Sequence, residues 1–131
     1  MASHYHAIVW IDHREAKVFH FNATEVDYMI LHPHNPTSHI HHKADAIGSG
    51  DAPLDQEFFE RVAEAIADAK AILITGPASA KSELAAHVAR HHPDIARCVL
   101  GVETIDHPSD GALVAVARLY FKTDDRRRPR I

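Results

Sequence analysis

The chain has 131 residues, of which 46% are hydrophobic, so it can bury a core as one domain without disulfides or metals. Its formal charge of −4, with the thirteen histidines counted as neutral, argues against a protein that binds nucleic acid over its whole surface. Cys98 is the one cysteine, which excludes an internal disulfide and favours a reducing compartment. The sequence shows no signal-peptide pattern and no apolar run near the roughly 20 residues that cross a bilayer, so we expect a cytoplasmic protein without membrane contact.

The first third of the sequence predicts three strands. Residues 6–12 (HAIVWID) are almost continuously apolar, which is typical of a strand covered on both faces. Residues 16–21 (AKVFHF) follow a short polar break and predict the second arm of a hairpin. Residues 25–31 (EVDYMIL) alternate between polar and apolar, which indicates an edge strand with one wet face. Because an apolar edge strand can pair with a second copy, a homodimer is a further expectation.

The rest of the chain alternates helices and strands. Five segments predict helix, strand, helix, strand and helix in turn: residues 54–70, 71–75, 80–92, 98–105 and 112–121. Ser79 is placed to cap the second of these helices, and Pro93 to end it. The periodicity of the last segment fits a strand as well as a helix, but its alanines and the preceding Ser109 favour a helix.

The predicted order β-β-β-α-β-α-β-α defines an α/β fold. An antiparallel meander comes first, and right-handed crossovers then add parallel strands. A mixed five-stranded sheet in the order 3-2-1-4-5, with helices on both faces, satisfies these connections and is the ribonuclease H-like arrangement. We expect residues 1–131 to form a single domain in which residues 122–131 are a frayed basic tail.

The segment ILITGPASAKSELAAH combines a strand, a turn of small residues and a Lys-x-Glu-Leu helix start at Lys81, Glu83 and Leu84. It resembles the middle domain of the archaeal and eukaryotic class-1 peptide release factors and Pelota. The segments AIVWIDHREAKVFHF and CVLGVETIDHPSDGAL are similar to the first hairpin and to a later strand and turn of that domain. The resemblance covers residues 6–121. It implies a bacterial release-factor-like protein, a component of the translational machinery that associates with the ribosome or RNA and needs no cofactor.

Residues 32–53 are predicted to form a long connection that contains three prolines and two glycines. In the release factors the corresponding loop carries Gly-Gly-Gln, which enters the peptidyl-transferase centre. Here the loop contains AIGSGD and no Gly-Gly-Gln. The resemblance therefore implies a ribosome-binding module without peptidyl-tRNA hydrolase activity. We expect that the protein is not an enzyme.

Candidate contacts to the ribosome, RNA or another anion fall in the loop, at a helix N-terminus and in the tail. They are His39, His41, His42, Lys43, Lys81, Ser82, Arg126, Arg127 and Arg128. Histidines gain charge on mild acidification, a helix N-terminus attracts anions, and arginines neutralise phosphates. Ala80 stands where a Walker A loop needs glycine, so ATP hydrolysis is rejected. The alternatives without binding are that the loop is merely solvated, that the helix N-terminus is a simple capped turn, and that the tail only aids solubility.

The alternative function is a metal-binding or hydrolytic protein that uses the histidine-rich loop 32–42. The candidate ligands are His32, His34, His39, His41 and His42. His32 and His34 are two residues apart at a strand end, so their rings lie on one side and form a chelating pair.

Two sharper chemistries are set aside. A nuclease of this fold needs several carboxylates around two metal ions, and Asp12 is the one well-placed acid, so we assign it to the hairpin turn. His107, Ser109 and Asp110 are adjacent in sequence, but triads form in space, so Ser109 is assigned to a turn and cap.

Overall fold

The computed structural model describes residues 6–22, 25–33 and 51–127. Its elements are β1 (His6–Ile11), β2 (Ala16–Phe21), β3 (Val26–Leu31), α1 (Asp51–Ala65), β4 (Ala71–Gly76), α2 (Ala80–His91), α3 (Pro93–Ala96), β5 (Val99–Thr104) and α4 (Asp110–Arg127). The five strands form one sheet in the order β3-β2-β1-β4-β5. The predicted α/β class and strand order are therefore confirmed.

Strand β1 lies at the centre of the sheet, as its continuous apolar sequence predicted. It pairs antiparallel with β2, from His6 opposite Phe21 to Ile11 opposite Ala16, and parallel with β4. β2 continues antiparallel to β3, and β4 continues parallel to β5. Every residue of β4 is buried, because β4 lies between two strands and under helices on both faces.

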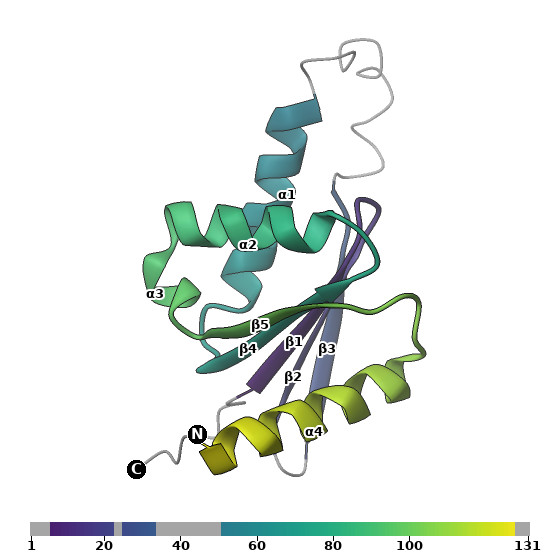
Figure 1. Ribbon diagram of the computed structural model, residues 1–131. Coiled ribbons are helices and arrows are strands. Elements are labelled where there is room, and N and C mark those ends of the chain that lie inside the picture. The colour runs from purple at the N-terminus through teal and green to yellow at the C-terminus, as the bar shows by residue number, and fades with distance from the viewer. Residues whose placement is uncertain (1–5, 23–24, 34–50, 128–131) are drawn as a thin grey trace.

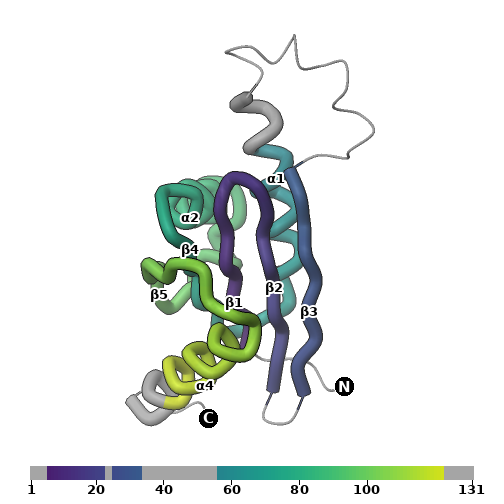
Figure 2. Tube along the Cα trace, turned by 90° about the vertical axis from the view of Figure 1, so that its right-hand side faces the viewer, coloured from purple at the N-terminus to yellow at the C-terminus, as the bar shows by residue number. Residues whose placement is uncertain are grey.

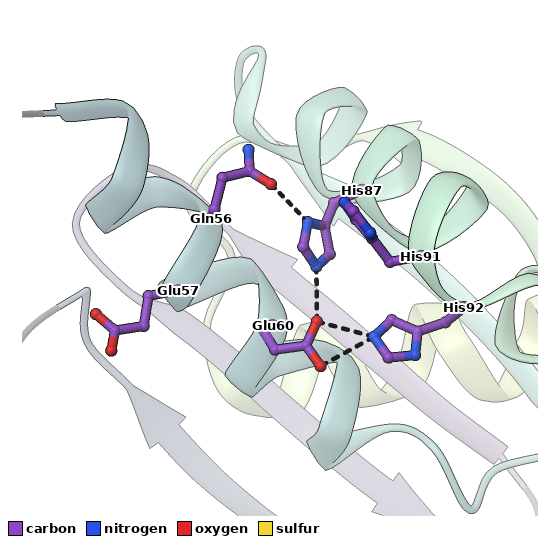
Figure 3. Close-up of a pocket in the computed structure, with 6 residues that line it drawn as sticks. All are labelled: Gln56, Glu57, Glu60, His87, His91 and His92. Carbon is purple, nitrogen blue, oxygen red and sulfur yellow. Dashed lines mark hydrogen bonds and ion pairs between the residues drawn. The ribbon is translucent and has the colours of Figure 1, made fainter. Parts of the chain in front are cut away.

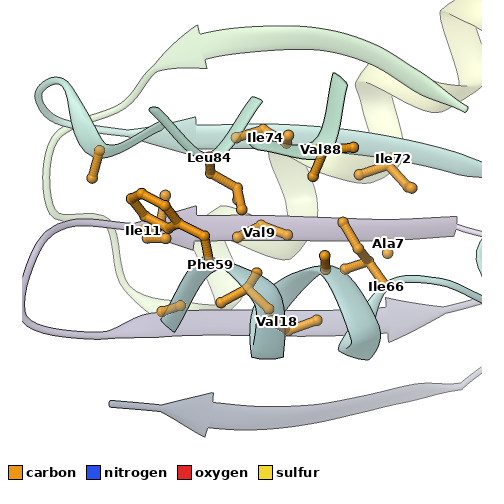
Figure 4. Packing of buried hydrophobic residues seen from close by; sticks show 14 of the residues in the cluster. Ala7, Val9, Ile11, Val18, Phe59, Ile66, Ile72, Ile74, Leu84 and Val88 are labelled. Atoms are coloured by element: carbon orange, nitrogen blue, oxygen red, sulfur yellow. The ribbon is translucent and has the colours of Figure 1, made fainter. Parts of the chain in front are cut away.

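Helices cover both faces of the sheet (Figures 1 and 2). α1 and α2 lie on one face, where Phe59, Val62 and Leu84 pack onto side chains of β1, β2 and β4 (Figure 4). α4 lies on the other face, where Leu113 and Phe121 pack onto β1, β2 and β4. Burying each Leu, Ile or Phe side chain stabilises the folded state by about 1.5–3 kcal/mol, so both helix layers contribute to stability.

The structure differs from the expected element limits in three places. α1 begins at Asp51 and ends at Ala65, earlier at both ends than predicted. A short helix, α3, follows Pro93, so the proline that ends α2 also begins the next turn of helix. α4 continues through residues predicted to be a frayed tail and ends at Arg127.

The edge strand β3 was expected to have one wet face, but both of its faces are exposed. Tyr28 is 54% exposed and Met29, on the opposite face, is 44% exposed. α4 does not reach over β3, so the apolar face of the strand stays open (Figure 2). Within the described residues, no helix is both long and apolar enough to cross a membrane.

Candidate functional site

A pocket of about 620 Å³ lies between α1 and the C-terminal end of α2. Its walls come from α1, α2 and the residue that joins α2 to α3: Gln56, Glu57, Glu60, His87, His91 and His92 (Figure 3). Glu57 points away from the histidines, whereas Gln56 and Glu60 point toward them. The pocket therefore brings one carboxylate and one amide of α1 against three imidazoles.

Glu60 is the centre of this cluster. Its Oε1 lies 2.9 Å from Nε2 of His87 and 2.8 Å from Nε2 of His92. Nε2 of His92 also lies 3.0 Å from the second carboxylate oxygen. The His87 side chain is 5% exposed, and that of Glu60 is 39% exposed. One carboxylate thus accepts hydrogen bonds from two rings at the mouth of a buried interface.

The pKa of Glu60 is lowered from its ordinary value. The hydrogen bond from His92 is the largest cause, and that from His87 is the second; partial burial opposes them. Both contacts favour the charged form, because a carboxylate accepts hydrogen bonds more strongly than a carboxylic acid does. Glu60 is therefore an anion over the whole neutral range.

Helical spacing positions the donors. On α1, Phe59 and Val62 face the sheet, so Gln56 and Glu60, four residues apart, lie together on the side that meets α2. On α2, Val88 faces the sheet, and the preceding His87 is turned toward α1.

Pro93 explains the position of His92. A proline disfavours helical backbone in the residue before it, and His92 has φ −138° and ψ 69°, outside the helix. The His92 N–H still donates a hydrogen bond to the carbonyl oxygen of Val88 at a distance of 2.8 Å, so the last turn of α2 keeps its helical hydrogen bond. This bend carries the His92 ring back to Glu60.

Three donors of the cluster could hold a metal ion. Glu60, His87 and His92 each offer one ligand atom, and these three atoms lie within 4.8 Å of one another. Among the described residues, this is the group of histidine, cysteine and acidic side chains close enough to share a metal ion. Two imidazoles and one carboxylate form a donor set that transition metals use.

The structure places Lys81 and Ser82 in the first turn of α2. The Lys81 ammonium donates to the carbonyl of Ala78, 2.5 Å away, and Ser82 is exposed. Ser79 occupies the predicted cap position, but its hydroxyl contacts Oε2 of Glu83 at 3.2 Å and makes no capping bond to a backbone amide. Ser79 is therefore the N-cap residue, as predicted, but it lacks the expected capping bond of the side chain. Anion binding by Lys81 and Ser82 stays a prediction.

Most of the predicted loop and tail residues lie outside the described residues: His34, His39, His41, His42, Lys43 and Arg128. Arg126 and Arg127 are the last residues of α4. His32 is exposed, and a guanidinium nitrogen of Arg61 donates to its carbonyl (2.6 Å) and to that of Pro33 (2.9 Å). α1 thereby holds the point where the histidine-rich loop leaves the sheet.

The two turn assignments are confirmed. Asp12 Oδ1 accepts from the backbone N–H groups of Arg14 (2.8 Å) and Glu15 (3.0 Å), so it closes the β1–β2 hairpin. Ser109 Oγ accepts from the N–H of Ala112 at 3.1 Å and caps α4.

Glu60, His87 and His92 were not predicted as ligands from the sequence, because the densest histidines lie in the loop 32–42. A signal was present: His87 and His91 are four residues apart on a predicted helix, which places their rings on one face. Nothing in the sequence paired that face with α1.

No family model matches the chain, and no curated protein matches it in sequence. Solved structures do match its fold. Pelota from Archaeoglobus fulgidus superposes with a TM-score of 0.60 at 14% identity, over 87% of this chain and 30% of that one. The archaeal translation termination factor aRF1 gives 0.55 at 12%, over 80% and 31%. Dom34 from S. cerevisiae gives 0.57 at 11%, over 93% and 36%.

These neighbours are release-factor-like translation factors, so the resemblance predicted from the sequence is confirmed at the level of the fold. The chain spans about a third of the length of each neighbour. Its fold matches only part of each of these proteins.

Proposed function

We propose that the chain is a translation-associated module that binds the ribosome or its RNA and does not hydrolyse peptidyl-tRNA. The observation that carries the proposal is the extent of the fold match: 80 to 93% of this chain superposes on about a third of each of the three factors. One of these is described as a translation termination factor, and another as a termination-like factor in RNA quality control. The cytoplasm, where translation takes place, is the proposed location.

Charge indicates which residues make the contact. The chain is acidic overall, so a nonspecific basic surface is not available for rRNA. Cationic groups are concentrated in the histidine-rich loop, with His39, His41, His42 and Lys43, and in the run Arg126 to Arg128. Three arginines at phosphates would give binding that weakens steeply with salt. Histidine protonation would strengthen binding as the pH falls toward 6.

The absence of hydrolysis follows from the sequence between β3 and α1. That segment contains no Gly-Gly-Gln, the tripeptide that the resemblance places in the hydrolytic loop of release factors. We expect no peptide release above background when the chain is added to ribosomes that carry peptidyl-tRNA. Release that requires the chain would contradict this part of the proposal.

Cosedimentation with purified ribosomes at low salt tests the binding. The wild type is expected in the ribosomal pellet and to leave it as salt rises. Two variants should bind more weakly: His39, His41 and His42 changed to Ala, and Arg126, Arg127 and Arg128 changed to Ala.

A matched control changes Lys70 and Arg90 to Ala. Both are exposed basic residues of the folded core, and neither is a proposed contact, so binding should be retained. If the wild type stays in the supernatant at low salt, or if the control loses as much binding as the other two variants, the proposed contact is wrong. The fold matches lend no support to the homodimer expected from the apolar edge strand β3, and light scattering of the unbound chain tests that expectation.

A further inference from the structure

We propose that Glu60, His87 and His92 form a binding site for a divalent transition metal, with Zn²⁺ as the ion that fits best. The site lies in the folded core between α1 and α2, outside the histidine-rich loop. It is independent of the proposed ribosome binding.

The donor set selects the class of metal. Two imidazole nitrogens and one carboxylate oxygen suit Zn²⁺ and its transition-metal neighbours, whereas Mg²⁺ and Ca²⁺ prefer oxygen ligands. Cys98 is not part of the group, so the proposed site has no thiolate ligand. The Glu60 carboxylate also supplies one negative charge, which partly neutralises the positive charge of the ion.

The two distances from Glu60 to the histidines are close to those of a zinc site, and all three donor atoms lie within 4.8 Å of one another. In a tetrahedral site with bonds of about 2.0–2.1 Å, ligand atoms lie roughly 3.3 Å apart. Glu60 Oε1 is 2.9 Å from Nε2 of His87 and 2.8 Å from Nε2 of His92. Each contact would lengthen by only about half an ångström to admit the ion in place of the hydrogen-bonded protons. Glu60 and His92 are partly exposed, so they have room to move.

Gln56 supplies a partner that a metal-bound His87 needs. Its Oε1 lies 2.9 Å from Nδ1 of His87, on the side of the ring away from Glu60. Histidines that bind metal usually donate their second ring N–H to a carbonyl or carboxylate, which fixes the tautomer. Metal on Nε2 and a proton on Nδ1 donated to Gln56 satisfy every polar atom of this buried ring.

Gln56 and Glu60 also orient the His87 ring. The two ring nitrogens lie 2.9 Å from Oε1 of Gln56 and 2.9 Å from Oε1 of Glu60. These contacts point Nε2 of the nearly fully buried ring toward the proposed metal position.

Three protein ligands leave one position of a tetrahedral ion unfilled. The pocket of about 620 Å³ lies against the cluster, and His91 lines it with its ring centroid 4.6 Å from that of His87. The fourth position can take a water molecule from this pocket, or the His91 ring. Three ligands with an exchangeable fourth is the arrangement of reactive zinc sites, and four protein ligands that of structural ones.

Zinc titration of the full chain, made without a histidine tag and stripped with a chelator, tests the site. At neutral pH we expect one equivalent of Zn²⁺ to bind at micromolar concentrations and to raise the melting temperature. Glu60→Ala and His92→Ala should each weaken binding at least 10-fold. Gln56→Ala should weaken it about 10-fold through loss of the outer hydrogen bond.

Two control variants separate this site from other histidines. His107→Ala removes an exposed histidine of the β5–α4 turn, and the triple variant of His39, His41 and His42 removes the loop candidates. Both should bind zinc as the wild type does. Co²⁺ added in place of Zn²⁺ should give visible d–d bands in the wild type and in both controls, and none in His92→Ala.

The proposal is overturned if the stripped wild type binds no zinc at micromolar concentrations. It is also overturned if Glu60→Ala and His92→Ala, shown by circular dichroism to be folded, bind as tightly as the wild type, or if binding disappears only in the triple loop variant. The last result would place the metal in the histidine-rich loop. None of these results bears on ribosome cosedimentation.

Discussion

Replacing Gly76 with alanine should destabilise the protein strongly. A Cβ atom at this position would lie 2.2 Å from the carbonyl oxygen of Ile11 and 3.4 Å from its carbonyl carbon. Both atoms belong to the backbone at the end of the central strand, so relief requires β1 and β4 to separate where they are fully buried. Overpacking of a core costs about 1–3 kcal/mol, and a clash with backbone belongs at the upper end, near 3 kcal/mol. For a chain of this size the melting temperature should fall by about 10 °C.

Gly111→Ala is the matched control. Its Cβ would meet nothing within 4 Å, and the residue lies in the first turn of α4. Alanine there should stabilise the protein by about 0.5–1 kcal/mol, because it restricts the unfolded chain and favours helix. Urea unfolding followed by circular dichroism measures both variants. If Gly76→Ala is as stable as the wild type, the strand-contact explanation is refuted.

Three further changes test individual contacts. The pKa of Glu60 is lowered, so its pairing with the histidines stabilises the metal-free protein above about pH 4.5. This stabilisation is lost as the pH falls through the lowered pKa. Glu60→Gln should therefore be less stable than the wild type at pH 6, and the urea midpoints of the two proteins should converge in acid. Trp10→Phe removes an indole N–H that donates to two backbone carbonyls at 2.7 and 3.2 Å, and should cost about 1 kcal/mol in the same assay. Ser109→Ala removes the α4 cap and should also cost about 1 kcal/mol; an unchanged midpoint would show that the cap contributes nothing.

The sheet could be predicted from the sequence because its signals are local. The continuous apolar run of β1 identified the central strand, and the alternation in β3 identified an edge. Handedness and the short hairpin connections then left few ways to order five strands. The turns at Asp12 and Ser109 were predicted for the same reason, since a side chain that bonds the backbone two or three residues on needs no distant partner.

Only the tertiary structure decided how much of the sheet each layer of helices covers. The alternation of Val26, Tyr28 and Ile30 indicated a buried face for β3, yet these residues are 41%, 54% and 42% exposed. A strand encodes which side chains share a face, but the length and crossing angle of a helix elsewhere in the chain decide whether that face is covered. α4 packs over the centre of the sheet and leaves the β3 edge uncovered.

The cluster at Glu60 was also decided by tertiary structure. Its histidines are 27 and 32 residues further along the chain. Periodicity fixed which sides of α1 and α2 face the sheet, and so limited which side chains could meet between the helices. The axial position of one helix against the other, set by packing of Phe59, Leu84 and Val88 on the sheet, brought Glu60 level with His87. The bend before Pro93 then added His92. Sequence periodicity carries no information on relative helix position, because it describes each helix about its own axis.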